Sequence, residues 1–166
     1  MLLVGEQPGD REDIEGVPFV GPAGRLLDRA LADAGIERDK VYLTNVVKHF
    51  KWRAASGGGG TRRIHDKPNW TEIRACLPWF NVELEAVRPR VLVLLGATAA
   101  QALLGPQFRI TRERGRPLES DLADTVIATV HPSAVLRSES RRKVEYAALV
   151  NDLRVAQRAA TSSRGG

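Results

Sequence analysis

Apolar residues gather in four short, nearly continuous runs along the chain: LLVG (2–5), VYLTNVV (41–47), VLVLLG (91–96) and TVIATV (125–130). A half-buried strand alternates apolar and polar residues, whereas a strand buried on both faces reads as an unbroken, β-branched run. The pattern therefore predicts four parallel strands in the interior of the protein.

Helical periodicity fills the segments between these runs. In GPAGRLLDRALADAG, the apolar residues Leu27, Ala30, Leu31 and Ala34 share one helical face, and Gly35 follows as a stop. A short helix is predicted over ATAAQALLG, residues 97–105. These helices are expected to cover the sheet.

Two longer helices are predicted elsewhere. Asn69 and Glu72 have the spacing of a capping box that opens a helix through residue 87, although Pro78 is expected to break or kink it. The final helix carries apolar residues at i, i+3, i+4 and i+7, namely Tyr146, Leu149, Val150 and Leu153.

Alternating strands and helices imply right-handed βαβ crossovers. They predict an α/β fold, a three-layer α/β/α sandwich around a central, mainly parallel four-stranded sheet. A chain of 166 residues is the size of one domain, and we expect a single domain over residues 1–158. Residues 159–166 are expected to form a disordered tail.

Composition and charge narrow the class of protein. Hydrophobic residues make up 43% and charged residues 27% of the chain, which is typical of a globular protein and not of a disordered one. No apolar run approaches the ~20 residues that span a bilayer, and the start lacks a signal-peptide pattern. The single cysteine fits a reducing compartment. We expect a cytoplasmic monomer without a membrane partner, and the net charge of +5 favours an anionic partner such as nucleic acid.

Polar side chains follow three of the predicted strands. Glu6 and Gln7 come after the first strand, Asn45 ends the second and His131 follows the fourth. Ligands of such sheets bind outside the carboxyl ends of the strands, so these side chains are expected at one common edge. The glycine-rich stretches match neither nucleotide fingerprint, G-x-G-x-x-G or Gly-Lys-Ser/Thr, and no nucleotide site is predicted.

Four stretches in this order, GEQPGD, GVPFVGPAGRLLD, TNVVKHFKW and HPSAVLR, resemble motifs of the uracil-DNA glycosylase superfamily in its iron–sulfur branch. KHFKW followed by RRIH is similar to the X-type enzymes of that branch (UdgX). The resemblance covers Gly5 to about Leu153. It implies uracil-containing DNA as the partner and excision of uracil from a nucleotide turned out of the base stack.

The resemblance gives catalytic roles to two residues of the common edge. Glu6 would stabilise the positive charge that develops at C1′ as the base departs, and His131 would donate a hydrogen bond to uracil O2. It places Gln7, Phe19 and Asn45 around the uracil, where Phe19 stacks on the base and the Asn45 amide reads its edge.

Local sequence leaves a plainer alternative open for each of these residues. Glu6 can be a solvated loop acid and Asn45 a turn asparagine at a strand end. Phe19 can be an ordinary core residue, and His131 can be satisfied by the backbone. The order of the four motifs is what favours the functional interpretation.

The third catalytic candidate is His65, which the sequence places on an exposed, mobile loop after the glycine run 57–60. The resemblance implies that its imidazole captures C1′ and stays attached to the abasic DNA. A ring nitrogen held beside an oxocarbenium has the advantage of proximity over bulk water. The alternative is a solvated loop histidine next to residues that contact DNA.

The resemblance also implies contacts with the DNA around the excised base. Arg62, Arg63 and Lys67 would hold the loop against phosphates. Leu136 or Arg137, in SAVLR, would fill the gap that the base leaves.

The implied cofactor is a [4Fe–4S] cluster with four protein ligands. Cys76 matches one of them, and His49 stands where the hydrolytic relatives have a cysteine, so these two residues form an incomplete set. The two cysteines of the family's N-terminal C-x-x-C are missing, and we expect the sequence to begin downstream of that cysteine-bearing segment.

Three functions therefore stay open at this point. The first is a uracil-DNA glycosylase that forms a covalent complex through His65. The second is a conventional, hydrolytic, multiple-turnover uracil-DNA glycosylase, and the third is a non-catalytic DNA-binding module. Product equal to enzyme supports the first, repeated release supports the second, and DNA binding without excision supports the third.

Overall fold

A computed structural model describes residues 1–55 and 63–162 of the chain. Arg62 and the glycine run 57–60, which were expected to help the loop reach DNA, lie outside the described residues. The strands are β1 (Leu2–Gly5), β2 (Tyr42–Asn45), β3 (Trp52–Ala54), β4 (Arg63–His65), β5 (Val91–Leu95), β6 (Pro117–Leu118) and β7 (Thr125–Thr129). The helices are α1 (Asp10–Glu15), α2 (Pro22–Asp33), η1 (Arg38–Lys40), α3 (Trp70–Val87), α4 (Ala97–Leu104), α5 (Ile110–Glu113), α6 (Pro132–Arg137) and α7 (Arg142–Thr161).

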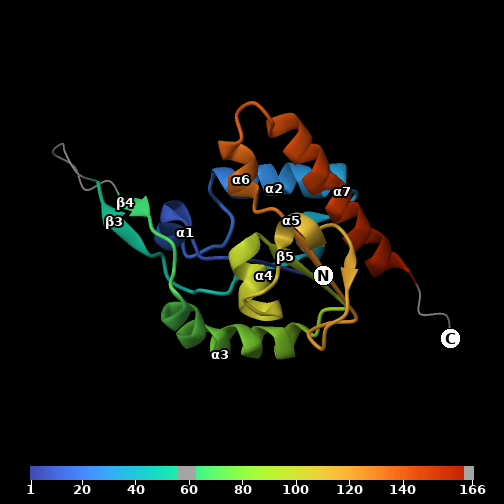
Figure 1. Ribbon diagram of the computed structural model, residues 1–166, viewed down its shortest axis with the longest axis horizontal. Helices are drawn as coiled ribbons and strands as arrows, with labels where there is room; N and C mark the ends of the chain where they lie inside the picture. Colours follow the sequence, from blue (N-terminus) through green and yellow to red (C-terminus); the bar gives the residue numbers. More distant parts are fainter. Residues whose placement is uncertain (56–62, 163–166) are drawn as a thin grey trace.

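A central sheet with the order β2-β1-β5-β7-β6 forms the middle layer. Helices α2, α6 and α7 lie on one side of it and α3 and α4 on the other (Figure 1). The four predicted strands, β1, β2, β5 and β7, pair in parallel, so the α/β/α sandwich is confirmed. The chain runs from β1 to β2 on one side and later returns to place β5 on the other. This reversal creates a crevice at the carboxyl ends of β1 and β5.

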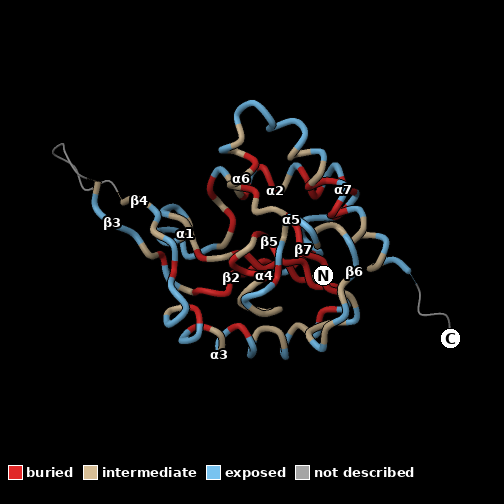
Figure 2. The backbone as a smooth tube through the Cα atoms, in the orientation of Figure 1, coloured by how far each residue is buried: buried red, intermediate tan, exposed pale blue. Residues whose placement is uncertain are grey.

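The core consists of two apolar layers, one on each face of the sheet (Figure 2). Along β5, Val93 faces α2 and α7, whereas Leu92 and Leu94 face the side of α3 and α4. Successive strand residues point to opposite faces, so both faces need apolar side chains. This is why the strand sequences read as continuous apolar runs.

The predicted helix signals appear in the structure at their expected positions. The Asn69 side chain accepts a hydrogen bond from the Glu72 N–H at 2.9 Å, and Glu72 Oε2 accepts one from the Asn69 N–H at 2.7 Å. Pro78 was expected to break or kink this helix. Helix α3 is one continuous element through Pro78, so the helix does not break there. Pro78 lies on the exposed face, where water can reach the carbonyl left without its helical partner.

Three expectations about secondary structure were wrong. The sheet has five strands and not four, because the two-residue β6 pairs antiparallel with β7. A disordered tail was expected from residue 159, but helix α7 continues to Thr161. Ala159 and Ala160 pack against the core. His65 is the last residue of strand β4, not a residue of an irregular loop.

Strands β3 and β4 form a separate antiparallel hairpin that projects from the body beside α1 (Figure 1). All three residues of β3 are exposed. Among the helices of residues 1–55 and 63–162, none has both the length and the apolar character to cross a bilayer.

Candidate active site

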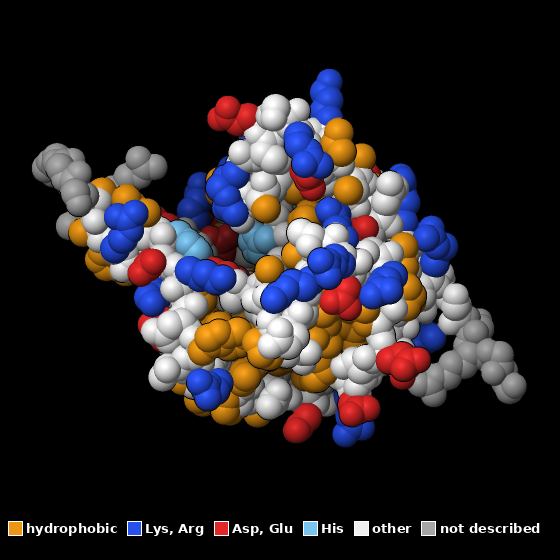
Figure 3. Space-filling model, in the orientation of Figure 1, with side chains coloured by type: hydrophobic (Ala, Val, Ile, Leu, Met, Phe, Trp, Pro, Cys, Tyr) orange, Lys and Arg blue, Asp and Glu red, His pale blue; other side chains and the backbone are white. Residues whose placement is uncertain are grey.

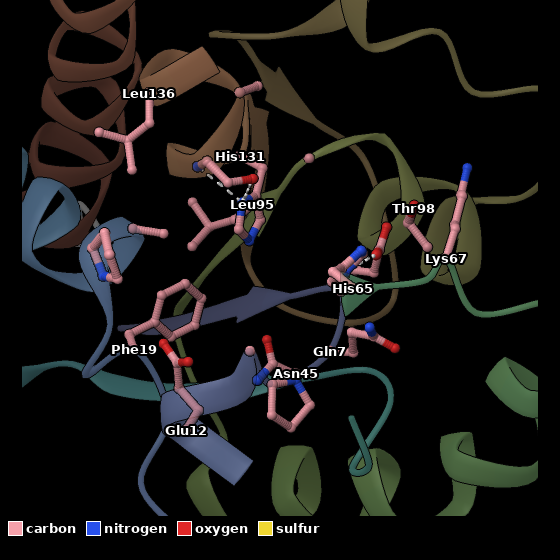
Figure 4. A pocket seen from close by; sticks show the side chains of 18 of the residues that line it. Gln7, Glu12, Phe19, Asn45, His65, Lys67, Leu95, Thr98, His131 and Leu136 are labelled. Atoms are coloured by element: carbon pink, nitrogen blue, oxygen red, sulfur yellow. Dashed lines mark hydrogen bonds and ion pairs between the residues drawn. The ribbon is translucent and has the colours of Figure 1, made fainter. Parts of the chain in front are cut away.

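A cavity of about 890 Å³ opens at the crevice between the carboxyl ends of the strands. Histidine side chains lie at this hollow, and Lys and Arg side chains gather around it (Figure 3). Most of the predicted site residues line the cavity: Glu6, Gln7, Phe19, Asn45, His65, Lys67, His131, Leu136 and Arg137. Segments that are far apart in the sequence therefore meet at one place (Figure 4).

Glu6 follows β1 directly, and its side chain is 20% exposed. Burial on its own raises the pKa of this carboxyl group. Hydrogen bonds from His65 and Thr98, together with the electrostatic effect of the His65 and His131 rings, outweigh burial and hold the pKa of Glu6 below its ordinary value. The cavity therefore contains a carboxylate that stays anionic near neutral pH.

His65 lies at the end of β4, across the cavity from the core of the sheet. Its Nε2 atom is 3.2 Å from Glu6 Oε1, and its side chain is 52% exposed. The ring packs at a tilt against Phe50, with the two centroids 6.3 Å apart. An imidazole nitrogen thus faces a carboxylate at the open end of the cavity.

His131 is the N-cap of α6, and its ring is held by that turn. The backbone N–H of Ser133 donates to His131 Nδ1 at 3.1 Å, which assigns the hydrogen of the neutral ring to Nε2. Burial lowers the pKa of His131 to about 4. The negative charge of Glu6 acts in the opposite direction, but its effect is smaller than that of burial. The ring is therefore neutral near pH 7 and has an N–H to donate.

The side chains of Phe19, Asn45 and His131 come together beside Gly5, close to the position that a Cβ on this residue would take. A Cβ on Gly5 would lie 2.5 Å from Asn45 Oδ1, 2.8 Å from Phe19 Cζ and 3.4 Å from His131 Nε2. The Phe19 and His131 rings are stacked with their centroids 6.1 Å apart. An aromatic face, an amide and an imidazole N–H thus border one narrow slot.

Phe19 reaches this slot through a left-handed backbone with φ of 60°. Such a conformation is uncommon for a residue with a side chain, and the surrounding structure must hold it. The Phe19 carbonyl lies so close to Gly24 that a Cβ there would clash with it. On the other side of the turn, Glu12 Oε1 accepts a hydrogen bond from the Gly21 N–H at 3.0 Å.

Gln7 lines the cavity, but its amide group bonds to the protein backbone. Nε2 donates to the carbonyls of Lys51 at 3.2 Å and Asp66 at 3.1 Å, and Oε1 accepts from the Lys51 N–H at 3.3 Å. Lys51 precedes β3 and Asp66 follows β4, so Gln7 closes the base of the hairpin. This differs from the predicted contact with uracil, because both polar atoms already have partners.

Arg63 also has partners within the protein. Its Nη1 is 2.6 Å from Asp13 Oδ2, its Nε bonds to Asp10, and its guanidinium lies over the Phe50 ring at 5.2 Å. Arg63 was predicted to bind DNA phosphates, but its guanidinium already forms ion pairs with two carboxylates of α1. The geometry instead makes Arg63 a tie between β4 and α1.

The other predicted DNA contacts lie at the cavity mouth. Lys67, Leu136 and Arg137 all line it, and Arg137 Nη1 donates to Ser133 Oγ at 3.1 Å. Their contact with DNA stays a prediction, as does any contact of Arg62, which is outside the described part of the chain.

The two predicted metal ligands do not form a metal site. Within residues 1–55 and 63–162, the His, Cys, Asp and Glu side chains form no group of three or more that could hold a metal ion. Cys76 is 6% exposed and packs among apolar residues of the core, whereas His49 is exposed. The described residues do not fit a cluster that needs four ligands.

Thr98 and Glu12 line the cavity and were missed by sequence reasoning. Thr98 lies two residues after Gly96, inside α4 and not directly after a strand, so the rule for strand ends does not indicate it. Glu12 is one acid among several in DREDIE. The hydrogen bond that Glu12 accepts from the Gly21 N–H distinguishes it from the other acidic residues of α1.

Comparison with known proteins agrees with the fold. The family model described as "Uracil DNA glycosylase superfamily" matches residues 1–154, and the chain belongs to this superfamily. It is 39% identical over 142 residues to the type-4 uracil-DNA glycosylase of Thermotoga maritima, which covers 84% of this chain and 68% of the relative. It is 38% identical over 154 residues to that of Archaeoglobus fulgidus, with 87% and 71% covered.

A solved structure supports the fold independently. The chain superimposes on the crystal structure of WT Pedobacter heparinus SMUG2 with a TM-score of 0.59 and 13% sequence identity. The match covers 98% of this chain and 76% of that chain.

Proposed function

We propose that this protein is a uracil-DNA glycosylase that excises uracil from DNA and is then captured by the abasic site through His65. The observation that carries this proposal is the 3.2 Å contact of His65 Nε2 with Glu6 Oε1 inside the cavity that also holds His131 and Asn45. A nucleophile, an anion and a leaving-group donor thus surround the space for one nucleotide.

Uracil enters the slot bordered by Phe19, Asn45 and His131. The base stacks on Phe19, and the Asn45 amide offers an acceptor for uracil N3–H and a donor for O4. Cytosine presents the opposite pattern at these positions and is rejected, because its pairing leaves buried polar groups unmatched. A Cβ on Gly5 would clash with Asn45 and Phe19, so the glycine allows these two side chains to approach the end of β1.

Cleavage of the C1′–N1 bond places a positive charge on the sugar and a negative charge on the base. The anionic carboxylate of Glu6 stabilises the sugar, and the Nε2–H of neutral His131 donates to uracil O2. Both groups are fixed in the folded protein before DNA binds, so little reorganisation is needed during the reaction.

Capture joins His65 Nε2 to C1′. In the resting protein this nitrogen carries a hydrogen that points to Glu6, because two lone pairs cannot face each other at 3.2 Å. As the N–C bond forms, the proton on Nε2 passes to Glu6, and the electron pair that this N–H bond leaves on Nε2 forms the bond to C1′. Uracil leaves with the electron pair of the broken C1′–N1 bond, so charge and atoms balance.

The test is a gel shift under denaturing conditions with a uracil-containing oligonucleotide. We expect an SDS-resistant adduct at no more than one DNA per protein, and none with His65→Ala. His49→Ala is the matched control, because this exposed histidine does not line the cavity. An adduct formed by His65→Ala would contradict the proposal.

The second candidate function is hydrolytic, multiple-turnover excision. The similarity to type-4 uracil-DNA glycosylases at 39% and 38% identity favours it. A time course with excess DNA separates the two: uracil release that stops at one equivalent supports capture, and release that continues supports hydrolysis.

A further inference from the structure

Glu12 is tied to both ends of the loop that carries Phe19. Its backbone carbonyl accepts a hydrogen bond from the Gly16 N–H at 2.9 Å, where α1 ends. Its side-chain Oε1 accepts a second one from the Gly21 N–H at 3.0 Å, where α2 begins. Figure 4 shows the Glu12 side chain pointing from α1 toward Phe19. One residue of α1 thus closes the loop 16–21 at its start and at its end.

The loop between these two hydrogen bonds has little other polar support. Within the part of the chain that the structure describes, residues 17–20 make no hydrogen bond of their own. Phe19 has φ of 60°, a left-handed conformation that the surrounding structure must hold. Its carbonyl packs on Gly24, and its ring stacks on His131. The place of Phe19 therefore depends on this packing and on the two hydrogen bonds to Glu12.

Two glycines allow the carboxyl group of Glu12 to come this close to the backbone. A Cβ on Gly21 would lie 3.0 Å from Glu12 Oε1, and a Cβ on Gly9 would lie 2.6 Å from Glu12 Oε2. Gly9 precedes α1 and Gly21 precedes α2, so the backbone at the start of both helices surrounds the carboxyl group. The acceptor atom is therefore held at one position between the two helices.

We propose that Glu12 is a positioning residue for Phe19, and that the hydrogen bond from Gly21 to its side chain sets where the Phe19 ring stands at the border of the slot. This inference rests on the proposed function, in which the uracil base stacks on that ring. Glu12 then acts on the reaction through the place of Phe19 and not through its own charge.

Two conservative substitutions separate the reach of the Glu12 side chain from its charge. Glu12→Gln keeps an oxygen acceptor at the same distance from the backbone and removes the charge. Glu12→Asp keeps the charge and moves the acceptor back by one methylene group, so the hydrogen bond from Gly21 is lost. Glu15→Asp is the matched control, since Glu15 lies on the same helix, pairs with the exposed Arg11 and does not line the cavity.

The first measurement is fluorine NMR of protein labelled with para-fluorophenylalanine, without DNA. The chain has four phenylalanines, and Phe19→Leu assigns the resonance of Phe19. Glu12→Asp should move and broaden this resonance, while that of Phe80, which is buried on the other face of the sheet, should stay in place. Glu12→Gln and Glu15→Asp should leave both resonances unchanged.

The second measurement is single-turnover uracil excision at subsaturating DNA in a double-mutant cycle. Glu12→Asp should lower the rate about tenfold, because stacking of the base on the ring is weakened. In a Phe19→Ala background the same substitution should change the rate less than about twofold, because no ring is left to position. Glu12→Gln should stay within about twofold of wild type.

A loss of rate in Glu12→Gln as large as that in Glu12→Asp would assign the effect to charge and overturn the proposal. An equal loss with and without the Phe19 ring, an unchanged rate in Glu12→Asp, or an unmoved Phe19 resonance in that folded variant would overturn it as well. The NMR measurement uses no DNA, so failure of the proposed function is seen separately, as wild-type protein that excises no uracil.

Discussion

The slot bordered by Phe19, Asn45 and His131 and the hairpin that carries His65 are held in different ways. Asn45 and His131 stand at the ends of buried strands, and the last residue of β7, Thr129, is fully buried and donates to Asp152 at 2.5 Å. The hairpin has no buried residue in either strand. Its ties to the body include the amide of Gln7 and the ion pairs of Arg63.

In the proposed function, this difference gives excision and capture separate structural supports. Asn45 and His131 share the stability of the core, because Asn45 ends β2 and His131 follows β7 in the central sheet. His65 depends on a few hydrogen bonds and ion pairs that are partly exposed to water, which contribute little individually. Glu6 is the residue that both regions share.

The largest effect is expected from Glu6→Gln, which removes the shared charge without changing the size of the side chain. Both excision and adduct formation should fall about 10²- to 10³-fold, because the sugar cation loses its stabilising anion. Single-turnover kinetics with quantified free uracil and adduct measure both. An undiminished excision rate would show that the slot works without this carboxylate.

The second-largest effect is expected in the pH dependence of the free energy of unfolding, because His131 is buried. His131 has a pKa of about 4 when folded and 6.5 as the ordinary value, so between these pH values the unfolded chain binds more protons. Stability should therefore fall as pH decreases from 6.5 to 4, by roughly 3 kcal/mol from this group. Urea unfolding of wild type and His131→Gln measures it. The variant should lose this part of the slope, and equal slopes would contradict the assigned burial.

Gln7→Ala should weaken the hairpin and spare the slot. Three hydrogen bonds at the hairpin base are lost, so adduct formation should fall about tenfold while excision stays within about threefold. The measured quantity is the ratio of adduct to free uracil. Gln157→Ala, which removes a hydrogen bond to Gly35 far from the hairpin, is the control. A parallel loss of excision would mean that Gln7 acts on uracil, as first predicted from the sequence.

The smallest effect is expected from Asp10→Asn combined with Asp13→Asn. Arg63 then loses its ion partners, and capture should slow about two- to fivefold because exposed pairs are weak. Hydrogen exchange at the amides of 63–66 should become faster. Glu15→Gln removes the Arg11 pair from the same helix and should change neither measurement. Unchanged exchange in the double variant would show that other contacts hold the hairpin.

Much of the scaffold could be predicted from local patterns. The apolar runs predict the four parallel strands, and the spacing of Asn69 and Glu72 predicts the start of α3. The positions of Glu6, Asn45 and His131 after strands place them at one sheet edge. These signals are local or follow from a general rule of parallel sheets.

The hairpin and its ties could not be predicted in the same way. Trp52–Ala54 and Arg63–His65 are three-residue, mostly exposed strands without an apolar pattern. The partners of Gln7 lie 44 and 59 residues away, and those of Arg63 lie 53 and 50 residues away. No local sequence pattern specifies such pairs.

The amino-acid sequence by itself determined the layers of this protein and the edge at which its chemistry lies, because burial on two faces and strand direction follow from residue type and order. Only the tertiary structure decided which polar groups line the cavity with free polar atoms and which hydrogen-bond to other parts of the chain. Hydrogen bonds and ion pairs are directional and short, so the roles of Gln7 and Arg63 depend on how distant segments pack together.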